Sequence, residues 1–397
     1  MSLSPFSIRR RSSGFSIVEL LVAMAIGLIL TLAVTAVMTR SEASKRSITS
    51  VNDANQTGAY ASFLLDRVVR SAGSGYAQRW SDVFGCRINA SRDNTALLPR
   101  AAALPAPFAA VPTALRLAPV AIIKGAAATD SDVLAVMSGT AGFGETAGRV
   151  LPASITGTGL RLPNTLGLRG SDIVMVAEPG VGCMLEQVQA GFAGSSDQQV
   201  TFAGRYYSAT GTDVNLASFG STGSQIYMIS MGNAVDNPPQ FQLFGVDPAT
   251  DTLVSYDLLH INDPDAPLPL AEGVVQMRAL YGIDTNADGR LDAWVDPAVA
   301  PWDSATLLNG SSASQQNLRH IVAIRVGLIL RTSLVERTGT ANDLSVTTLY
   351  QAPTSITLFQ DLPPALQQTR ALSANEQKLR HRTVEATIPL RNILLVP

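Results

Sequence analysis

The sequence predicts an α+β protein in which one long N-terminal helix packs on an antiparallel β-sheet head with a large loop-rich insertion. An apolar run from Phe15 to Met38 continues, without a proline, into a segment of helical spacing that ends near residue 75. The second half of the chain instead alternates apolar and polar residues with the period typical of half-buried strands. With 397 residues, 46% of them hydrophobic and 15% charged, the chain can bury a sizeable core.

The apolar run is long enough to cross a membrane. Phe15–Met38 has 24 residues, which would extend about 36 Å as a helix. Arg9–Arg11 precede the run and place the N-terminus in the cytoplasm by the positive-inside rule. Three basic residues between positions 40 and 46 reduce this charge asymmetry. We therefore expect residues 15–39 to span the membrane and the rest of the chain to lie beyond it.

Glu19 is an unusual residue in such a span, because a carboxylate costs roughly 2.5–3.5 kcal/mol at mid-bilayer. A secretory signal peptide has a shorter apolar stretch, although Val34-Thr35-Ala36 could serve as its cleavage site. A plain signal anchor fits the length but does not explain Glu19. An interaction of Glu19 with its own helix N-terminus would contribute only about 0.3–1 kcal/mol.

A third interpretation accounts for all of these residues. The arginines, Gly14, Phe15 and Glu19 together resemble the class III leader of type IV pilins and related pseudopilins. The resemblance implies cleavage after Gly14 by a prepilin peptidase and N-methylation of Phe15. It also implies that Glu19 pairs with the Phe15 amine of a neighbouring subunit, so that two costly charges offset each other. Residues 1–14 would then be a leader peptide, residues 15–39 a transmembrane half-helix and residues 40–75 a periplasmic amphipathic half-helix.

The half-helix beyond the span has its own apolar pattern. Apolar residues at near-helical spacing predict a stripe that lies on the sheet: Ile48, Val51, Tyr60, Phe63, Leu64 and Val68. Polar residues between positions 52 and 58 argue against a coiled coil instead. Gly73 and Gly75 predict the end of the helix.

Residues 76–397 form the predicted periplasmic head, and its first part, 76–240, is rich in small residues and turns. Strands are predicted there at Asp132–Met137, Asp172–Ala177, Gln199–Phe202 and Gln225–Ser230. The stretch Pro99–Pro119 suggests an irregular surface excursion.

In residues 241–397 the strand pattern is stronger. Three sets alternate on one face each, namely Val275, Met277, Ala279, Tyr281 and Ile283; Val322, Ile324, Val326, Leu328 and Leu330; and Val384, Ala386, Ile388 and Leu390. Pro389 predicts an edge position for the last of these strands. We expect antiparallel pairing, with one face covered by the N-terminal helix.

Three blocks in this second half are similar to the PilW family of minor pilins, namely Gly273–Asp284, Ala323–Ser333 and Thr387–Asn392. This resemblance covers the first 75 residues and scattered blocks beyond residue 240, and residues 76–240 are variable. It implies a structural subunit that takes part in type IV pilus assembly or priming, held in the inner membrane with a periplasmic head and found in the pilus after assembly. Its implied partners are other minor pilins, the major pilin and the prepilin peptidase.

Two alternatives stay open. One is a J-type minor pseudopilin of type II secretion, which shares the same N-terminal chemistry. The other is a membrane-anchored calcium-binding adhesin or hydrolase that never polymerises.

The two cysteines, Cys86 and Cys183, predict a disulfide if the head lies in an oxidising compartment. Such a bridge would stabilise the fold by about 4–5 kcal/mol in the chain-entropy model. Two separate buried thiols are the alternative.

One segment has the ligand spacing of a calcium loop. Asp284, Asn286 and Asp288 would supply side-chain oxygens, Arg290 a backbone carbonyl and Asp292 a direct or water-mediated ligand. The glutamate expected at the twelfth loop position is absent, since Val295 stands there. An Asx-rich turn explains the same residues without a metal.

No catalytic set is apparent, and no cofactor is required by the pattern. The three histidines, His260, His320 and His381, are far apart in sequence and fit surface or strand positions. The formal net charge is −2, and loss of the leader would remove three arginines and no acid, leaving about −5. A mildly acidic chain gives no electrostatic reason to expect nucleic-acid binding.

Overall fold

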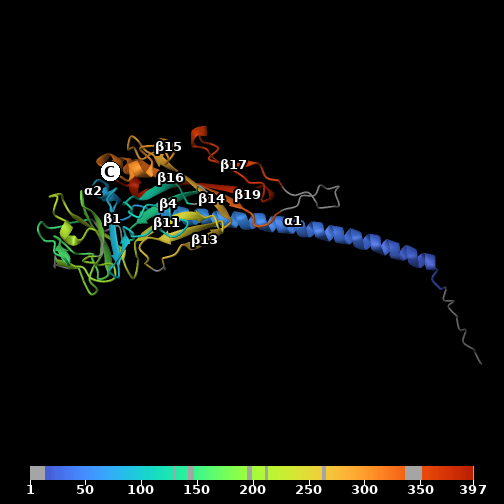
Figure 1. The fold of residues 1–397 in the computed structure, drawn as a ribbon, viewed down its shortest axis with the longest axis horizontal. Helices are drawn as coiled ribbons and strands as arrows, with labels where there is room; N and C mark the ends of the chain where they lie inside the picture. Colours follow the sequence, from blue (N-terminus) through green and yellow to red (C-terminus); the bar gives the residue numbers. More distant parts are fainter. Residues whose placement is uncertain are drawn as a thin grey trace, which may run out of the picture.

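The computed structural model describes residues 14–396 apart from 128–130, 142–146, 195–198, 211–212, 262–264 and 336–350. A single long helix projects from a β-rich head, which confirms the predicted α+β class (Figure 1). The predicted leader, except for Gly14, lies outside the described residues. The division into leader, span, periplasmic half-helix and head stays a prediction.

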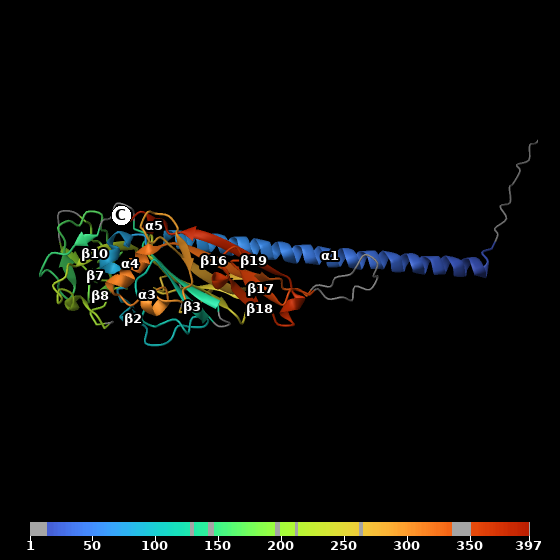
Figure 2. The same ribbon diagram turned by 90° about the horizontal axis from the view of Figure 1, so that it is seen from above.

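Helix α1 runs without interruption over Ile17–Ser71, a length of 55 residues. Its first part extends away from the head, and its last turns pack on the head (Figure 2). Gly73 follows with a positive φ of 77°, a conformation that glycine adopts without steric cost. The helix therefore ends where its glycines predict.

The face of α1 that contacts the head differs from the predicted stripe. The buried positions are mostly small: Ser50, Ala54, Gly58, Ala61, Leu65, Val69 and Ala72. Ile48, Tyr60 and Phe63 are instead exposed, by 59%, 52% and 61%. The reason is the close approach of the helix to the sheet, because a Cβ atom on Gly58 would lie 2.8 Å from Val384 Cγ2. A larger side chain would not fit at Gly58, and Ile48, Tyr60 and Phe63 lie outside the contact.

A four-stranded antiparallel sheet lies under α1, in the order β15-β14-β16-β19. Its strands are Ala293–Val295, Val274–Ile283, Ile321–Arg331 and His381–Pro389. The three predicted alternating segments are therefore confirmed as strands. The last of them is at the edge of the sheet, with Pro389 as its final residue.

Both faces of this sheet are covered, whereas the sequence predicted cover on one face. The sequence predicted Val275 on the same face as Met277 and Ala279. A register shift between Val274 and Gln276 places Val275 on the opposite face instead. Val275 packs with Leu280 and Ile329 in a separate apolar cluster. The hairpin of β17 (Ser355–Leu358) and β18 (Gln368–Ala371) contributes to that cluster.

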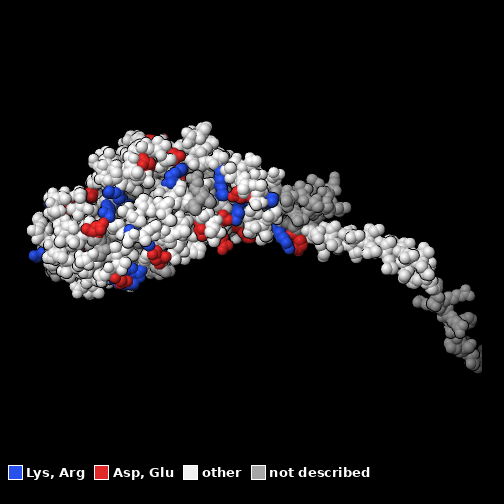
Figure 3. Space-filling model, in the orientation of Figure 1, with Lys and Arg blue, Asp and Glu red and all other residues white. Residues whose placement is uncertain are grey.

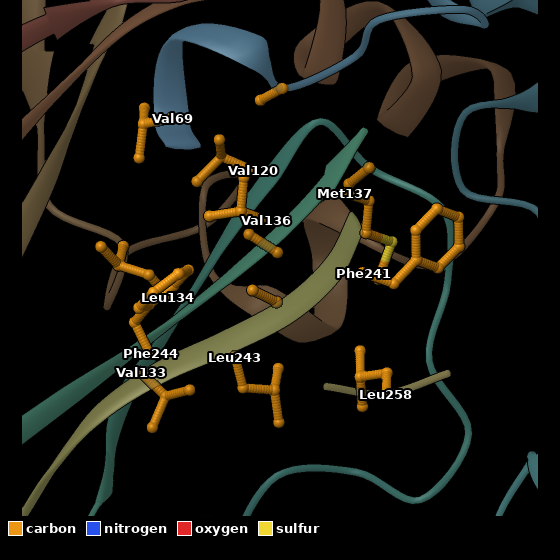
Figure 4. Packing of buried hydrophobic residues seen from close by; sticks show 14 of the residues in the cluster. Val69, Val120, Val133, Leu134, Val136, Met137, Phe241, Leu243, Phe244 and Leu258 are labelled. Atoms are coloured by element: carbon orange, nitrogen blue, oxygen red, sulfur yellow. The ribbon is translucent and has the colours of Figure 1, made fainter. Parts of the chain in front are cut away.

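The main core lies between this sheet, α1 and a five-stranded antiparallel sheet of order β13-β12-β11-β4-β3. These strands are Leu268–Glu272, Thr252–Asp257, Gln240–Asp247, Ser131–Ser138 and Val120–Ala127. Figure 4 shows Leu134, Phe241 and Leu243 from adjacent strands of this sheet in the core. Strands β3 and β4 come from residues 76–240, and they share this sheet with β11, β12 and β13, which lie from residue 240 onward. Residues 76–240 are therefore not a separate insertion.

A six-stranded sheet forms the end of the head away from the projecting helix (Figure 2), in the order β2-β1-β8-β7-β10-β5. Its strands are Thr95–Leu98, Ile88–Arg92, Gly182–Gln187, Asp172–Glu178, Tyr227–Asn233 and Gly148–Arg149. The β1–β8 pair is parallel, and the other pairs are antiparallel. A second apolar cluster packs between this sheet and the pair formed by β6 (Gly159–Arg161) and β9 (Gln199–Thr201).

The predicted strands of this region are confirmed at β4, β7, β9 and β10, but the prediction for Pro99–Pro119 is wrong in one respect. The segment has little regular structure, yet Leu104, Phe108 and Leu117 are buried in the main core. Phe108 lies against the ring of Tyr256, with 6.0 Å between ring centroids. Apolar side chains thus make this irregular segment part of the core.

Short helices complete the described chain: η1 (Ala77–Arg79), α2 (Trp80–Val83), η3 (Leu216–Ser218), α3 (Ser304–Leu307), α4 (Ser312–His320), η4 (Pro364–Leu366), η5 (Glu376–Lys378) and α5 (Arg391–Leu394).

Candidate functional site

The predicted processing and assembly residues lie together at the projecting end of α1. Gly14 and Phe15 lie just before Ser16, the N-cap of the helix, and Glu19 is in its first turn. Phe15 is 86% exposed, and Glu19 is exposed as well. All three residues are therefore accessible from outside the head.

Local hydrogen bonds fix the start of this helix. The Ser16 hydroxyl accepts a hydrogen bond from the Val18 backbone N–H at 3.3 Å, and the Ser16 N–H donates to Glu19 Oε2 at 3.2 Å. This is a capping box, which satisfies backbone N–H groups that have no partner within the helix. Ser16-x-x-Glu19 is readable in the sequence, so the spacing could have predicted the cap. One oxygen of Glu19 serves the cap, and the second can accept another donor.

The apolar run after Glu19 has the properties of a membrane span by length and composition. The head buries none of the most apolar stretch of this run. Three hydroxyls in or near it donate to carbonyls one turn back, Thr31 to Leu28, Thr35 to Thr31 and Thr39 to Ala36, at 2.7–3.0 Å. These bonds satisfy polar groups that lipid cannot. On the face shown in Figure 3, the projecting helix carries almost no charge until it nears the head.

The predicted disulfide is present between Cys86 and Cys183, with 5.7 Å between their Cα atoms. Cys183 is the second residue of β8 and Cys86 lies two residues before β1, its parallel neighbour. The bridge ties the segment that follows α1 to the middle of the six-stranded sheet.

In the predicted calcium loop, the side-chain oxygens accept hydrogen bonds that form turns. Both carboxylate oxygens of Asp284 accept backbone N–H groups, from Asp288 at 3.3 Å and Gly289 at 2.7 Å. Asp292 accepts the N–H and hydroxyl of Thr285, and these bonds hold its pKa below the usual range. Within the described ranges, no three His, Cys, Asp or Glu side chains converge as a metal-binding group. The Asx-turn interpretation accounts for this geometry, and calcium binding stays a prediction.

The sequence did not reveal a polar cluster around Tyr256. Its hydroxyl accepts a hydrogen bond from Arg100 Nη1 at 2.6 Å, donates to Asp265, and lies 2.7 Å from Nε2 of His260. Arg100 also bonds Asp265 at 2.8 Å, which lowers the pKa of that carboxyl. His260 is buried rather than at the surface, and burial lowers its pKa. These residues attach the Pro99–Pro119 segment to β12. Because Arg100 is far from the others in sequence, no local pattern predicted the cluster.

A second cluster that sequence reasoning missed joins the two central sheets. Asp132 of β4 is fully buried and lies 3.1 Å from Nη1 of Arg278 on β14. It also accepts the backbone N–H of Ala279 at 3.0 Å, and Lys124 lies 3.7 Å away. Charge pairing and hydrogen bonding together compensate the burial of this carboxylate. The cluster therefore holds β4 and β14, from two different sheets, together.

Two comparisons with known families agree with this geometry. Residues 9–35 match the prokaryotic N-terminal methylation motif. Residues 227–392 match the family described as type IV pilus-assembly protein W, PilW. The second match includes all four strands of the sheet that lies under α1. No curated protein and no solved structure gave a significant match.

The methylation motif, the projecting apolar helix and the β-rich head define a pilin-type subunit. Such a protein is structural rather than enzymatic, is anchored in a membrane and interacts with other pilus components. Together the two family matches support a PilW-type minor pilin.

Proposed function

We propose that this chain is a minor pilin that enters a type IV pilus, or the complex that primes one, through α1. The observation that supports this most directly is the arrangement of Phe15 and Glu19 at the free end of the helix. Cleavage after Gly14 would create an α-amine on Phe15, one helical turn from the carboxylate. A charge of each sign at the same depth in the membrane can pair with the opposite charge on a neighbouring helix.

The helix cap alone does not account for Glu19. A carboxylate near a helix N-terminus contributes about 0.3–1 kcal/mol, while its burial at mid-bilayer costs roughly 2.5–3.5 kcal/mol. Pairing with the amine of another subunit would offset the remainder. The capping hydrogen bond uses Oε2, so the cap and the pairing are compatible.

A second observation concerns α1 beyond the span. Ile48, Tyr60 and Phe63 are exposed on the side of the helix away from the head. Exposed large apolar side chains on one helix mark a contact surface for another apolar surface. The helix therefore offers apolar contacts both within the membrane and just outside it, as side-by-side packing of subunits requires.

The proposal places the chain in the inner membrane, with a cytoplasmic N-terminus and a periplasmic head, before assembly into the pilus. Prepilin peptidase, other minor pilins and the major pilin would be its partners. A J-type pseudopilin would use the same N-terminal chemistry, so recovery from sheared surface pili separates the two roles.

The test compares substitutions that separate charge pairing from helix capping. Glu19→Gln keeps an oxygen acceptor for the Ser16 N–H but removes the charge, and Ser16→Ala removes the capping hydroxyl but keeps the charge. We expect Glu19→Gln and Glu19→Ala to insert in the membrane but to be lost from purified pili. Ser16→Ala should be incorporated.

Mass spectrometry of the wild-type protein should find methyl-phenylalanine at residue 15. Normal incorporation of Glu19→Ala into pili, or a mature chain that begins at Met1, would refute the assembly role.

A further inference from the structure

Strand β19 (His381–Pro389) is at the border of the four-stranded sheet, with β16 on one side. Among the described residues, no strand pairs with its other side. Figures 1 and 2 both place this strand beside α1. Nine residues of backbone therefore form an outer edge next to the helix that is expected to carry the subunit contacts.

The hydrogen-bond pattern identifies which backbone groups point outward. The Leu390 N–H donates to the carbonyl of Val322 at 2.8 Å. Since hydrogen-bonded residues alternate along an antiparallel ladder, even-numbered residues of β19 bond to β16. The N–H and C=O groups of Thr383, Glu385 and Thr387 therefore point away from β16. Pro389 belongs to the same outward series, where its missing N–H breaks no bond to β16.

Among the described residues, the other edges of the three larger sheets are short or interrupted. Strands β2, β5 and β15 have four, two and three residues. Strand β13 contains Pro269, and β3 has a register shift after Ile123. Such features prevent pairing with another chain. Only β19 among these edges keeps a long regular run, with its proline confined to the last residue.

The outward-directed residues of β19 also carry no unbalanced charge. Thr383 and Thr387 are exposed hydroxyl residues. The Glu385 carboxylate lies 2.7 Å from Arg325 Nη2 and accepts the Phe359 N–H at 2.7 Å. Lysine, a common protective residue on edge strands, is absent from β19, and the one arginine, Arg382, belongs to the series that bonds to β16 and donates to Asn55. A partner strand of neutral β-branched residues is well suited to pair with this edge, because the threonines of β19 form favourable cross-strand pairs with such residues.

We propose that the outer edge of β19 pairs with an extended strand in the head of a different pilin subunit. This inference rests on the proposed function, because it requires a neighbour whose helix lies beside α1. The two elements of this chain run side by side in the same direction, since Asn55 bonds Arg382 at 2.8 Å and Asn392 bonds the carbonyl of Ser71 at 3.1 Å. A neighbour anchored in the same membrane thus brings its head alongside β19.

The direction of β19 also disfavours antiparallel pairing with the β19 edge of a second copy. Antiparallel pairing of two β19 edges would relate the copies by a two-fold axis across the strands. Their α1 helices would then point in opposite directions, with the two spans at opposite ends of the dimer. Two copies held in one membrane cannot adopt this arrangement.

A matched pair of substitutions at Thr387 tests the edge. Thr387→Pro removes an outward N–H without removing a bond to β16, and Thr387→Val removes only the hydroxyl. We expect recovery of Thr387→Pro in sheared pili to fall at least about tenfold, while Thr387→Val stays within about twofold of wild type. Both should keep the wild-type unfolding temperature in detergent. Equal recovery of the two variants overturns the inference.

Hydrogen exchange on the wild-type chain gives a readout that does not depend on how a variant folds. The amides of Thr383, Glu385 and Thr387 should exchange rapidly in the isolated protein and slowly in assembled pili. Equal exchange in the two states overturns the inference.

A photo-crosslinker at Thr383 identifies the partner. A crosslink to a strand of another subunit that carries its own methylation motif supports the proposal, and a crosslink to a second copy or to an unrelated protein overturns it. If Glu19→Ala is lost from pili but Thr387→Pro is retained, strand pairing fails and the proposed function stands. If Glu19→Ala is retained, the proposed function itself fails.

Discussion

Glu186 leads to a sharp prediction about the pH dependence of stability. This residue is on β8, its side chain is completely buried, and within the described chain neither carboxylate oxygen has a hydrogen-bond partner. Alternation along the strand directs it toward the second apolar cluster, with Met184. Burial without a compensating partner raises the pKa of Glu186 from 4.5 to about 9.

The sign follows from comparing the folded and unfolded states. Below pH 4.5 the carboxyl is protonated in both states, so its contribution to stability is fully present. As the pH rises above 4.5, the unfolded chain ionises while the folded chain keeps its proton until about pH 9. Each pH unit in this window removes about 1.4 kcal/mol. The loss reaches roughly 3 kcal/mol at pH 7, relative to acidic conditions.

Urea unfolding of the full chain in detergent between pH 4 and 8 measures this loss. We expect Glu186→Gln, which cannot ionise, to show a free energy of unfolding that falls less steeply with pH than that of the wild type. Glu186→Asp keeps a buried carboxyl and should retain the steep fall. The difference between the two curves isolates this one group from the other titrating residues. Superimposable pH profiles for Glu186→Gln and wild type would refute the reasoning.

Two further predictions concern the disulfide and the calcium loop. Cys86→Ser should reduce the free energy of unfolding by about 4–5 kcal/mol, because the bridge closes a long loop; a reductant should have the same effect on the wild type and none on the variant. Millimolar calcium should raise the melting temperature and protect residues 284–292 from hydrogen exchange, with the weak affinity of extracellular modules. Asp288→Ala should abolish that response, and an unchanged wild-type melting temperature would exclude the metal.

Much of the architecture was readable from local patterns. The alternation in residues 322–330 and 384–390 predicted β16 and β19, and Pro389 predicted the edge position, because a proline cannot donate to a neighbouring strand. Gly73 predicted the end of α1 for an equally local reason, its tolerance of positive φ. The candidate site at Gly14, Phe15 and Glu19 was visible because its residues are consecutive or one turn apart.

Other features depended on contacts between distant segments. Tyr60 and Phe63 predicted the buried stripe by their hydrophobicity, yet the buried face is the one with Ala54, Gly58 and Ala61. The distance between helix and sheet decides this, and that distance is set by Val384 and Leu330, more than 250 positions away. The bulge that turns Val275 to the opposite face likewise arises from pairing with β16.

The sequence by itself determined the methylation motif at the N-terminus, the positions of seven of the nineteen described strands and the cysteine pair, because each depends on residues that are neighbours or few in number. Only the tertiary structure decided which face of α1 meets the head and which strands share a sheet across residue 240. These outcomes depend on the order in which strands pair, and periodicity fixes the conformation of a strand without specifying its neighbour.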